Sequence, residues 1–168
     1  MNKNRLKLYY ISDNYVDYMR QFDDKIRYNK KGTRPYVGIV YEHNNRYYFA
    51  PLASPKPKHK KMDKKALDIW LIDNGDLGII NFNNMLPSPL SELKEIMPIV
   101  TDIKYKKLLE NQISSINKDR YLIMKKVERF YYQYKNNRLS ESITKRCCNF
   151  AILEDKSEKY KEQMKEKI

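Results

Sequence analysis

The sequence predicts an α+β domain: a small, strongly bent antiparallel sheet, or half-barrel, with helices packed on one side. Before residue 100, short runs rich in Val, Ile, Tyr and Phe alternate with turn residues, which is typical of strands. After residue 101, apolar residues recur at helical spacing. The length of 168 residues fits one domain of ordinary size. We therefore expect a single domain over residues 1–168.

One early helix and two hairpins are expected in the first part of the chain. Ser12 is a suitable N-cap for a helix over Asp13–Asp24, in which aromatic residues and a methionine recur at helical spacing. Turn residues at His43–Asn45 and at Asn74-Gly75 each separate two strand-like runs. The predicted strands cover Leu6–Ile11, Tyr36–Glu42, Arg46–Pro51, Ile69–Ile72 and Leu77–Phe82.

The second part of the chain carries an apolar stripe that we expect to pack on the sheet. Its members follow a 4-3-4-3 spacing, broken only by one arginine: Leu109, Ile113, Ile116, Arg120, Ile123, Val127, Phe130 and Tyr134. The stripe predicts one long helix, or two helices hinged near Asn117. A short helix around Ser140–Arg146, a strand over Cys148–Leu153 and a terminal helix over Asp155–Lys167 complete the expected order of elements.

The composition favours a polyanionic partner and excludes several classes of protein. Lys and Arg number 34 against 21 Asp and Glu, a formal net charge of +13, and nucleic acid is the first candidate. Neither a secretory signal nor an apolar run long enough for a membrane span is visible, so we expect a cytoplasmic protein without a membrane partner. The sequence lacks dinucleotide, P-loop and zinc-protease motifs, and no cofactor or metal is expected.

The only two cysteines, Cys147 and Cys148, are neighbours in the sequence. Adjacent cysteines rarely pair with each other, and two are too few for a disulfide framework or a Cys-based zinc site. We therefore expect them to be a small buried apolar pair.

The segment from residue 50 to 61, APLASPKPKHKK, is the most unusual in the chain. Its three prolines predict a stiff, exposed loop after a strand, in which Ser54, Lys56 and Lys58 emerge on one side. A merely solvated basic loop is the alternative, but solubility alone gives no reason for such rigidity. We also expect His59, Lys60 and Lys61 to contact the same polyanion as Lys58, whereas His43, in a turn, is expected to be solvated.

A second basic segment, residues 27–35, precedes the strand expected to pair with the one that leads to Ser54. Because paired strands bring their ends together, the two loops can share one cleft. This cleft would be free of carboxylates and would contain five candidate catalytic residues: Tyr28, Lys31, Arg34, Ser54 and Lys56. Hydroxyl, ammonium and guanidinium groups suit a phosphodiester.

RNA would supply its own nucleophile to such a site. Its 2′-hydroxyl can attack the adjacent phosphorus, so a ribonuclease needs a base, an acid and cations but no metal. Lys56 is a candidate fixed charge or base, and His59 is a competing acid or base; the sequence does not decide between them. A basic DNA- or RNA-binding module without catalysis is the alternative class, because it needs the same phosphate contacts.

The helical part also offers a basic face, opposite the apolar stripe. Residues 118–146 contain nine basic and three acidic residues, and tyrosines lie among the basic ones. Unpaired bases stack on tyrosine, so we expect RNA to contact this face; an ordinary solvated helix face is the alternative. The RNA-binding candidates are Lys118, Lys125, Lys126, Arg129, Tyr131 and Lys135, beside Tyr132 and continued by Arg138, Lys145 and Arg146.

In the segment around Ser54 and in several other stretches, the sequence resembles the ToxN/AbiQ family, the endoribonuclease toxins of type III toxin–antitoxin and phage abortive-infection systems. The A-P-L-x-S-P-K segment that ends at Lys56 is the most specific match, and the other stretches follow in the right order. The matching stretches are Leu8–Ile26, Arg34–Val40, Tyr47–Lys56, Leu77–Pro87, Tyr105–Gln112 and Cys148–Lys156.

The resemblance implies more than the spacing does. It implies a compact SH3-like barrel, similar to the Kid and MazF toxins, and metal-independent RNA cleavage that leaves a 2′,3′-cyclic phosphate and a 5′-hydroxyl. It places Ser54 and Lys56 in the active site, with Tyr28, Lys31 and Arg34 nearby, and Ala53 stands where family members often have Thr. It also implies cellular and phage RNA as substrates. The implied inhibitor is a small RNA antitoxin of pseudoknotted repeats, which the toxin processes and binds in a closed ring.

Overall fold

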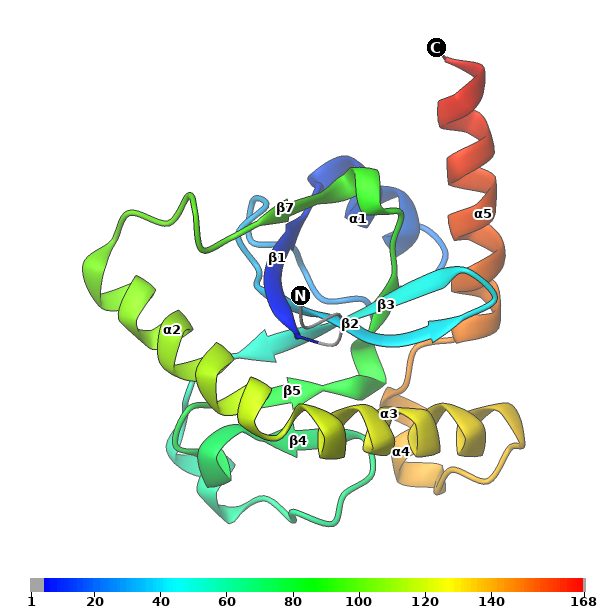
Figure 1. Ribbon diagram of the computed structural model, residues 1–168. Helices are drawn as coiled ribbons and strands as arrows, with labels where there is room; N and C mark the ends of the chain where they lie inside the picture. The colour runs from blue at the N-terminus through cyan, green and yellow to red at the C-terminus, as the bar shows by residue number, and fades with distance from the viewer. Residues whose placement is uncertain (1–4, 168) are drawn as a thin grey trace.

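A bent antiparallel sheet forms the centre of the molecule (Figure 1). The computed structural model describes residues 5–167. Seven strands follow the order β4-β5-β3-β2-β1-β7, with β6 paired to β3 beside that path, and every pairing is antiparallel. The strands are β1 Lys7–Ile11, β2 Tyr36–His43, β3 Arg46–Ala53, β4 Ile69–Leu71, β5 Ile79–Asn81, β6 Leu86–Pro87 and β7 Leu93–Glu95.

The five strands predicted from the sequence are confirmed to within two residues at each end. The hairpin between β2 and β3 turns at Asn44 and Asn45, both with positive φ, as their small polar side chains permit. Strand β3 extends beyond the predicted end because its last residues, Leu52 and Ala53, pair with β5. Strands β6 and β7 were not predicted, since two or three residues are too few for a period-2 pattern.

Helix α1, Asp13–Arg20, begins where predicted, with the Ser12 hydroxyl accepting a hydrogen bond from Tyr15 N. It ends at Arg20, before the predicted Asp24, and Asp23 forms hydrogen bonds outside the helix. The Asp23 carboxylate accepts hydrogen bonds from the backbone N–H groups of Lys25 and Asn149, at 3.0 and 2.7 Å. The chain therefore turns towards the start of the last helix.

The apolar stripe lies on two helices, α2 Ile103–Lys118 and α3 Arg120–Lys135, which meet at Asp119. Beside this hinge, the buried Asn117 amide bonds to both the N–H and the C=O of Leu6, at 2.8 and 2.9 Å, which ties the helix pair to the start of β1. Five stripe residues are fully buried in the core, as predicted: Leu109, Ile116, Ile123, Val127 and Phe130.

The predicted strand over Cys148–Leu153 is wrong, because helix α5 begins at Phe150 and continues to Glu166. Asn149 caps it by accepting a hydrogen bond from Ile152 N, and its buried residues recur at helical spacing. Helix α4, Glu141–Arg146, confirms the short helix before it.

We expected all helices on one side of the sheet, and this prediction is wrong. In Figure 1, α2 and α3 extend below the sheet, whereas α5 rises along its flank. Helix α3 contacts β2, and α5 contacts β6 and α1. The α+β class and the antiparallel sheet are confirmed.

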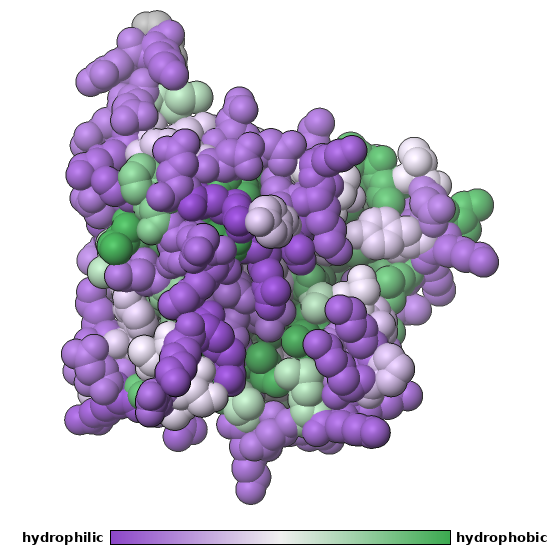
Figure 2. Space-filling view, turned by 180° about the vertical axis from the view of Figure 1, so that it is seen from behind, coloured by the Kyte–Doolittle hydropathy of each residue, from purple (hydrophilic) through white to green (hydrophobic). Residues whose placement is uncertain are grey.

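Cys147 and Cys148 are free and buried, as predicted. Burial raises the pKa of the Cys147 thiol to about 12, so both packing and protonation make it unreactive. No helix within residues 5–167 is long and apolar enough to cross a membrane. On the face shown in Figure 2, hydrophilic side chains predominate and apolar ones form small patches.

Candidate active site

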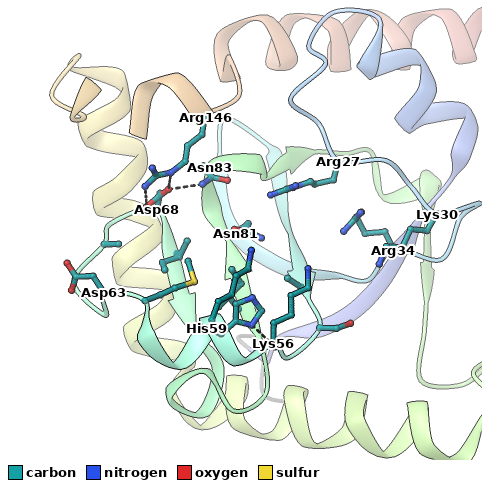
Figure 3. Close-up of a pocket in the computed structure, with 17 residues that line it drawn as sticks. Arg27, Lys30, Arg34, Lys56, His59, Asp63, Asp68, Asn81, Asn83 and Arg146 are labelled. Carbon is teal, nitrogen blue, oxygen red and sulfur yellow. Dashed lines mark hydrogen bonds and ion pairs between the residues drawn. The ribbon is translucent and has the colours of Figure 1, made fainter. Parts of the chain in front are cut away.

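The end of β3, the loop after it, strands β4 and β5 and the basic segment before β2 enclose a cleft of about 680 Å³ (Figure 3). Ser54, Lys56 and Lys58 are exposed and line this cleft together, as predicted, although Lys58 lies in a 3₁₀ helix and not in the extended loop that the prediction assumed. Arg34, from the second basic segment, lines it as well. The structure therefore brings the two predicted basic loops to one site.

The Ser54 loop is held rigidly, but not by its prolines alone. Pro57–Lys61 form a short 3₁₀ helix, a correction to the irregular loop we expected; Pro57 occupies its first position, where the missing N–H costs nothing. Lys56 N donates to His59 Nδ1 at 3.2 Å, and His59 N donates to Lys56 O at 2.9 Å. These two hydrogen bonds fix the backbone of Lys56.

His59 itself is only 1% exposed although it lines the cleft, and its predicted contact with RNA remains a prediction. Burial and the nearby Lys58 and Lys56 lower the pKa of His59, which favours the neutral ring. In that form Nδ1 accepts from the backbone and the proton lies on Nε2. Neither nitrogen is then free to act as a base, and His59 positions Lys56.

The second basic segment contributes a different lysine from the one predicted. Lys30 lines the cleft and Lys31 does not, and both residues have positive φ. Arg34 Nε donates to the carbonyl of Tyr28 at 2.5 Å, and burial lowers the pKa of Arg34. Arg27, which was not among the predicted site residues, also lines the cleft.

Tyr28 lies outside the main cleft, in a neighbouring one of about 380 Å³. Its ring is 74% exposed, and the Arg20 guanidinium lies 3.9 Å from the ring centroid. Four residues line both clefts: Arg27, Arg34, Asn83 and Arg146. The predicted place of Tyr28 in the same cleft as Ser54 is therefore not found, but its cleft adjoins that one.

The expectation of a site without carboxylates is wrong, because Asp63 and Asp68 line the same cleft. The Asp68 side chain is completely buried, and it accepts hydrogen bonds from Arg146 Nε at 2.6 Å, Arg146 Nη2 at 3.1 Å and Asn83 Nδ2 at 2.7 Å. Burial raises the pKa of Asp68, but the hydrogen bonds from Arg146 and Asn83 outweigh it and the net pKa is lowered. Asp68 is therefore ionised and fully engaged.

The rest of the basic loop faces away from the cleft. Lys60 forms an ion pair with Asp76 at 3.1 Å, and neither Lys60 nor Lys61 lines the cleft. Both are exposed, so their predicted contact with RNA remains a prediction.

The basic helical face on α3 needs one correction. Tyr131 is 3% exposed; its hydroxyl donates to the buried Glu154 carboxylate at 2.5 Å and its ring stacks on Tyr41, with 4.6 Å between centroids. It therefore belongs to the core, because it follows Phe130 on the buried side of the helix. Tyr132 is 57% exposed and provides the free ring instead.

The basic residues of this face differ in how exposed they are and in whether they already contact other parts of the protein. Lys126 is half-buried: its Nζ donates to the carbonyl of Lys64 at 3.2 Å and lies 5.7 Å from the centroid of Trp70. Lys118 is exposed on α2. Lys125, Arg129 and Lys135 are exposed and line a groove of about 600 Å³ together with Tyr132, and Tyr131 closes one wall of it.

A hydroxyl, several ammonium groups and three guanidinium groups around one cleft are the donors that recognise a phosphodiester. The family model described as toxin ToxN of type III toxin–antitoxin systems matches residues 7–158. The chain belongs to the ToxN family.

Characterised relatives agree along nearly the whole chain. The chain is 34% identical to the endoribonuclease ToxN of Bacillus thuringiensis subsp. kurstaki, over 96% of this chain and 88% of that protein. It is 30% identical to the endoribonuclease ToxN of Pectobacterium atrosepticum (90% and 91%), and 29% identical to the endoribonuclease AbiQ of Lactococcus lactis subsp. lactis (92% and 89%).

Solved structures match as well. The structure of AbiQ, a lactococcal anti-phage endoribonuclease of a type III system, superimposes with a TM-score of 0.78 at 28% identity, over 94% of this chain and 98% of that one. A structure from work on selective toxin inhibition by a non-coding RNA pseudoknot gives 0.78 at 29% identity, over 94% and 99%.

Proposed function

We propose that this endoribonuclease toxin of a type III toxin–antitoxin system cuts RNA in the cleft around Ser54 and Lys56. The observation that carries the assignment is the meeting of Ser54, Lys56 and Lys58 with Arg34 at one cleft, from the two segments that flank the hairpin of β2 and β3. Membership of the ToxN family supports it.

In the proposed reaction the 2′-hydroxyl of the RNA attacks the adjacent phosphorus, and the bond from phosphorus to the 5′-oxygen breaks. The products are a 2′,3′-cyclic phosphate and a 5′-hydroxyl; the proton lost by the 2′-oxygen is balanced by the proton gained by the leaving oxygen. Ser54 Oγ and Lys56 Nζ donate hydrogen bonds to the phosphate oxygens. Arg34 and Arg27 stabilise the negative charge of the transition state.

This chemistry requires neither a metal nor a cofactor from the protein. The substrate supplies the nucleophile, and the protein's cations supply the electrostatic stabilisation that a metal provides in other nucleases. The 3₁₀ helix supports this role because it fixes the backbone of Lys56 before any RNA binds.

The antiparallel sheet fits an SH3-like barrel of the Kid and MazF type, since β3 pairs with β2 at one edge and with β5 and β6 at the other. One such domain accounts for residues 1–168. It would act in the cytoplasm, where cellular and phage RNA are translated, and bind its inhibitor there. The inhibitor is a small RNA of pseudoknotted repeats, joined with the toxin in a closed ring; the matched structure with toxin inhibition by an RNA pseudoknot supports this.

The test is to substitute Ser54→Ala and Lys56→Ala and to measure growth inhibition and RNA cleavage. Both side chains are exposed, so the free energy of unfolding is expected to change by no more than about 0.5 kcal/mol while activity is lost. Ser91→Ala and Lys107→Ala are matched controls, because both residues are exposed and lie outside the cleft. Full toxicity of both active-site variants would refute the proposed site, and folded protein that binds RNA but never cuts it would indicate a non-catalytic module.

A further inference from the structure

The cleft has two chemically different halves. Arg27, Lys30, Arg34 and Lys56 line the half where the phosphodiester is proposed to bind (Figure 3). The other half is lined by four apolar side chains, by two amides and by three charged side chains: Met62, Ala66, Ile69 and Ile79, then Asn81 and Asn83, then Asp63, Asp68 and Arg146. An apolar wall makes no favourable contact with a charged phosphate, so this half suits another part of the substrate.

Asn81 provides an unused amide on the floor of this half. It is the last residue of β5, paired in register with Ile69 of β4, and its residue surface is only 8% exposed. Within residues 5–167, its side chain has no hydrogen-bond partner, yet it lines the cleft (Figure 3). A nearly buried amide usually has its hydrogen bonds satisfied by protein, so the floor offers both a donor and an acceptor to a ligand.

The wall beside Asn81 is rigid. Asn83 Nδ2 is held by Asp68, and the same carboxylate binds Arg146 through two N–H groups. Because an ionised carboxylate only accepts, this contact also fixes which side of the Asn83 amide faces Asp68. The Arg146 guanidinium is held on both sides, because its Nη1 also donates to Ser142 Oγ at 3.0 Å, and its side chain, 48% exposed, lines the cleft.

A flat molecule with apolar faces and a polar edge fits between apolar walls and a free amide. A nucleobase has this form, and asparagine can pair with a base edge through two hydrogen bonds at once. A volume of about 680 Å³ also exceeds the space that a single phosphodiester fills.

We propose that the half of the cleft centred on Asn81 binds one unpaired nucleobase next to the scissile phosphate and recognises its hydrogen-bonding edge. Asn81 would then determine specificity, with Asp68 and Arg146 as positioning residues. The inference rests on the proposed endoribonuclease function, because the base must belong to RNA held at Ser54 and Lys56.

The test is to cut a pool of single-stranded RNA oligonucleotides with randomised positions and to sequence the new ends. The wild-type protein is expected to prefer one base at a position next to the cut. Asn81→Ala is expected to reduce that preference by about 5- to 150-fold, the loss of one two-bond base contact, at that position only. Asn81→Asp, which keeps the shape but replaces the N–H donor by an acceptor, is expected to change the preferred base there.

Asn117→Ala is the matched control, a buried amide outside the cleft whose loss destabilises the fold but leaves base preference unchanged. If wild-type protein shows no base preference, or if both Asn81 variants keep it, the proposed base site is wrong. The same holds if a folded Asn81→Ala protein loses cleavage equally at all sequences. Failure of the endoribonuclease assignment looks different, because the wild-type protein would then cut no RNA at all.

Discussion

Gly78 lies just before β5, next to the Ser54 loop, and Gly78→Ala is expected to displace that loop and reduce RNA cleavage. Gly78 has φ of +97°, and a Cβ there would lie 2.1 Å from the carbonyl oxygen of Ala53, the residue before Ser54. The positive φ alone costs about 1–2 kcal/mol for alanine. Relieving the clash requires a shift of roughly 1 Å in the backbone that carries Ser54, and such overpacking adds about 1–3 kcal/mol.

Gly32→Ala separates these two contributions. Gly32 has φ of +79°, but the nearest atom to its added Cβ is Asp13 Oδ2 at 3.6 Å, an ordinary contact. It therefore carries the conformational cost without the clash. We expect a loss of unfolding free energy of about 1–2 kcal/mol for Gly32→Ala and about 2–5 kcal/mol for Gly78→Ala.

Urea unfolding gives the two free energies, and cleavage of a short fluorescent RNA gives kcat/KM at a temperature where each variant is folded. A misplacement of about 1 Å at a reacting group costs on the order of 100-fold in rate, so Gly78→Ala is expected to lose that much. If Gly78→Ala is as stable as Gly32→Ala and cleaves RNA at the wild-type rate, the contact with Ala53 does not position the loop.

Two further predictions concern the cleft. Because the folded pKa of Asp68 is below its unfolded value of about 3.9, its contribution to stability is present above that pH and is lost as the pH falls through the folded pKa. The difference in urea midpoint between the wild-type protein and Asp68→Asn should therefore be largest near pH 7 and shrink towards pH 3; a constant difference would contradict it. RNA cleavage should stay within twofold after EDTA treatment and leave cyclic phosphate ends, whereas a strict requirement for Mg²⁺ or Mn²⁺ would refute the proposed mechanism.

The sequence predicted the parts of the site that depend on local pattern. Ser54, Lys56 and Lys58 lie within five residues just after β3, and Arg34 lies just before β2, which pairs with β3, so hairpin geometry was enough to bring them together. The sequence did not indicate that Lys30 and not Lys31 lines the cleft, because adjacent lysines in a turn, both with positive φ here, are equivalent in local pattern.

The other half of the cleft could not be predicted from local pattern. Asp68 and Arg146 are 78 residues apart, and only the packing of α4 against the sheet region brings them into contact. Asn81 and Asn83 lie among apolar residues whose pattern predicts a strand, not an open cleft. The prediction of a strand at the start of α5 was also wrong because local pattern is ambiguous there. A short apolar run from Cys148 to Leu153 suits a strand and a buried helix turn equally.

The last prediction concerns the inhibitory RNA, which we expect to bind the basic groove on α3 as well as the cleft. Tyr132→Ala should weaken inhibition because its exposed ring can stack on an unpaired base, an interaction of about 1–3 kcal/mol. Tyr131→Phe is the matched control: it removes a hydrogen bond to buried Glu154, so it should lower stability yet leave inhibition unchanged. Equal loss of inhibition in both variants would show that packing, not stacking, is responsible.

Charge reversal tests the same groove independently. Lys125→Glu, Arg129→Glu and Lys135→Glu should each reduce the salt dependence of RNA binding, by about 0.7 in the logarithmic slope for each lost contact with single-stranded RNA. Lys126 is left unchanged because it holds the carbonyl of Lys64, and its reversal would disturb the fold. Since the groove is separate from the Ser54 cleft, cleavage of short RNA should change less than inhibition. Digesting the purified complex with a protease or with an unrelated ribonuclease identifies the inhibitor, and a toxin held inactive only by a polypeptide would refute the RNA antitoxin.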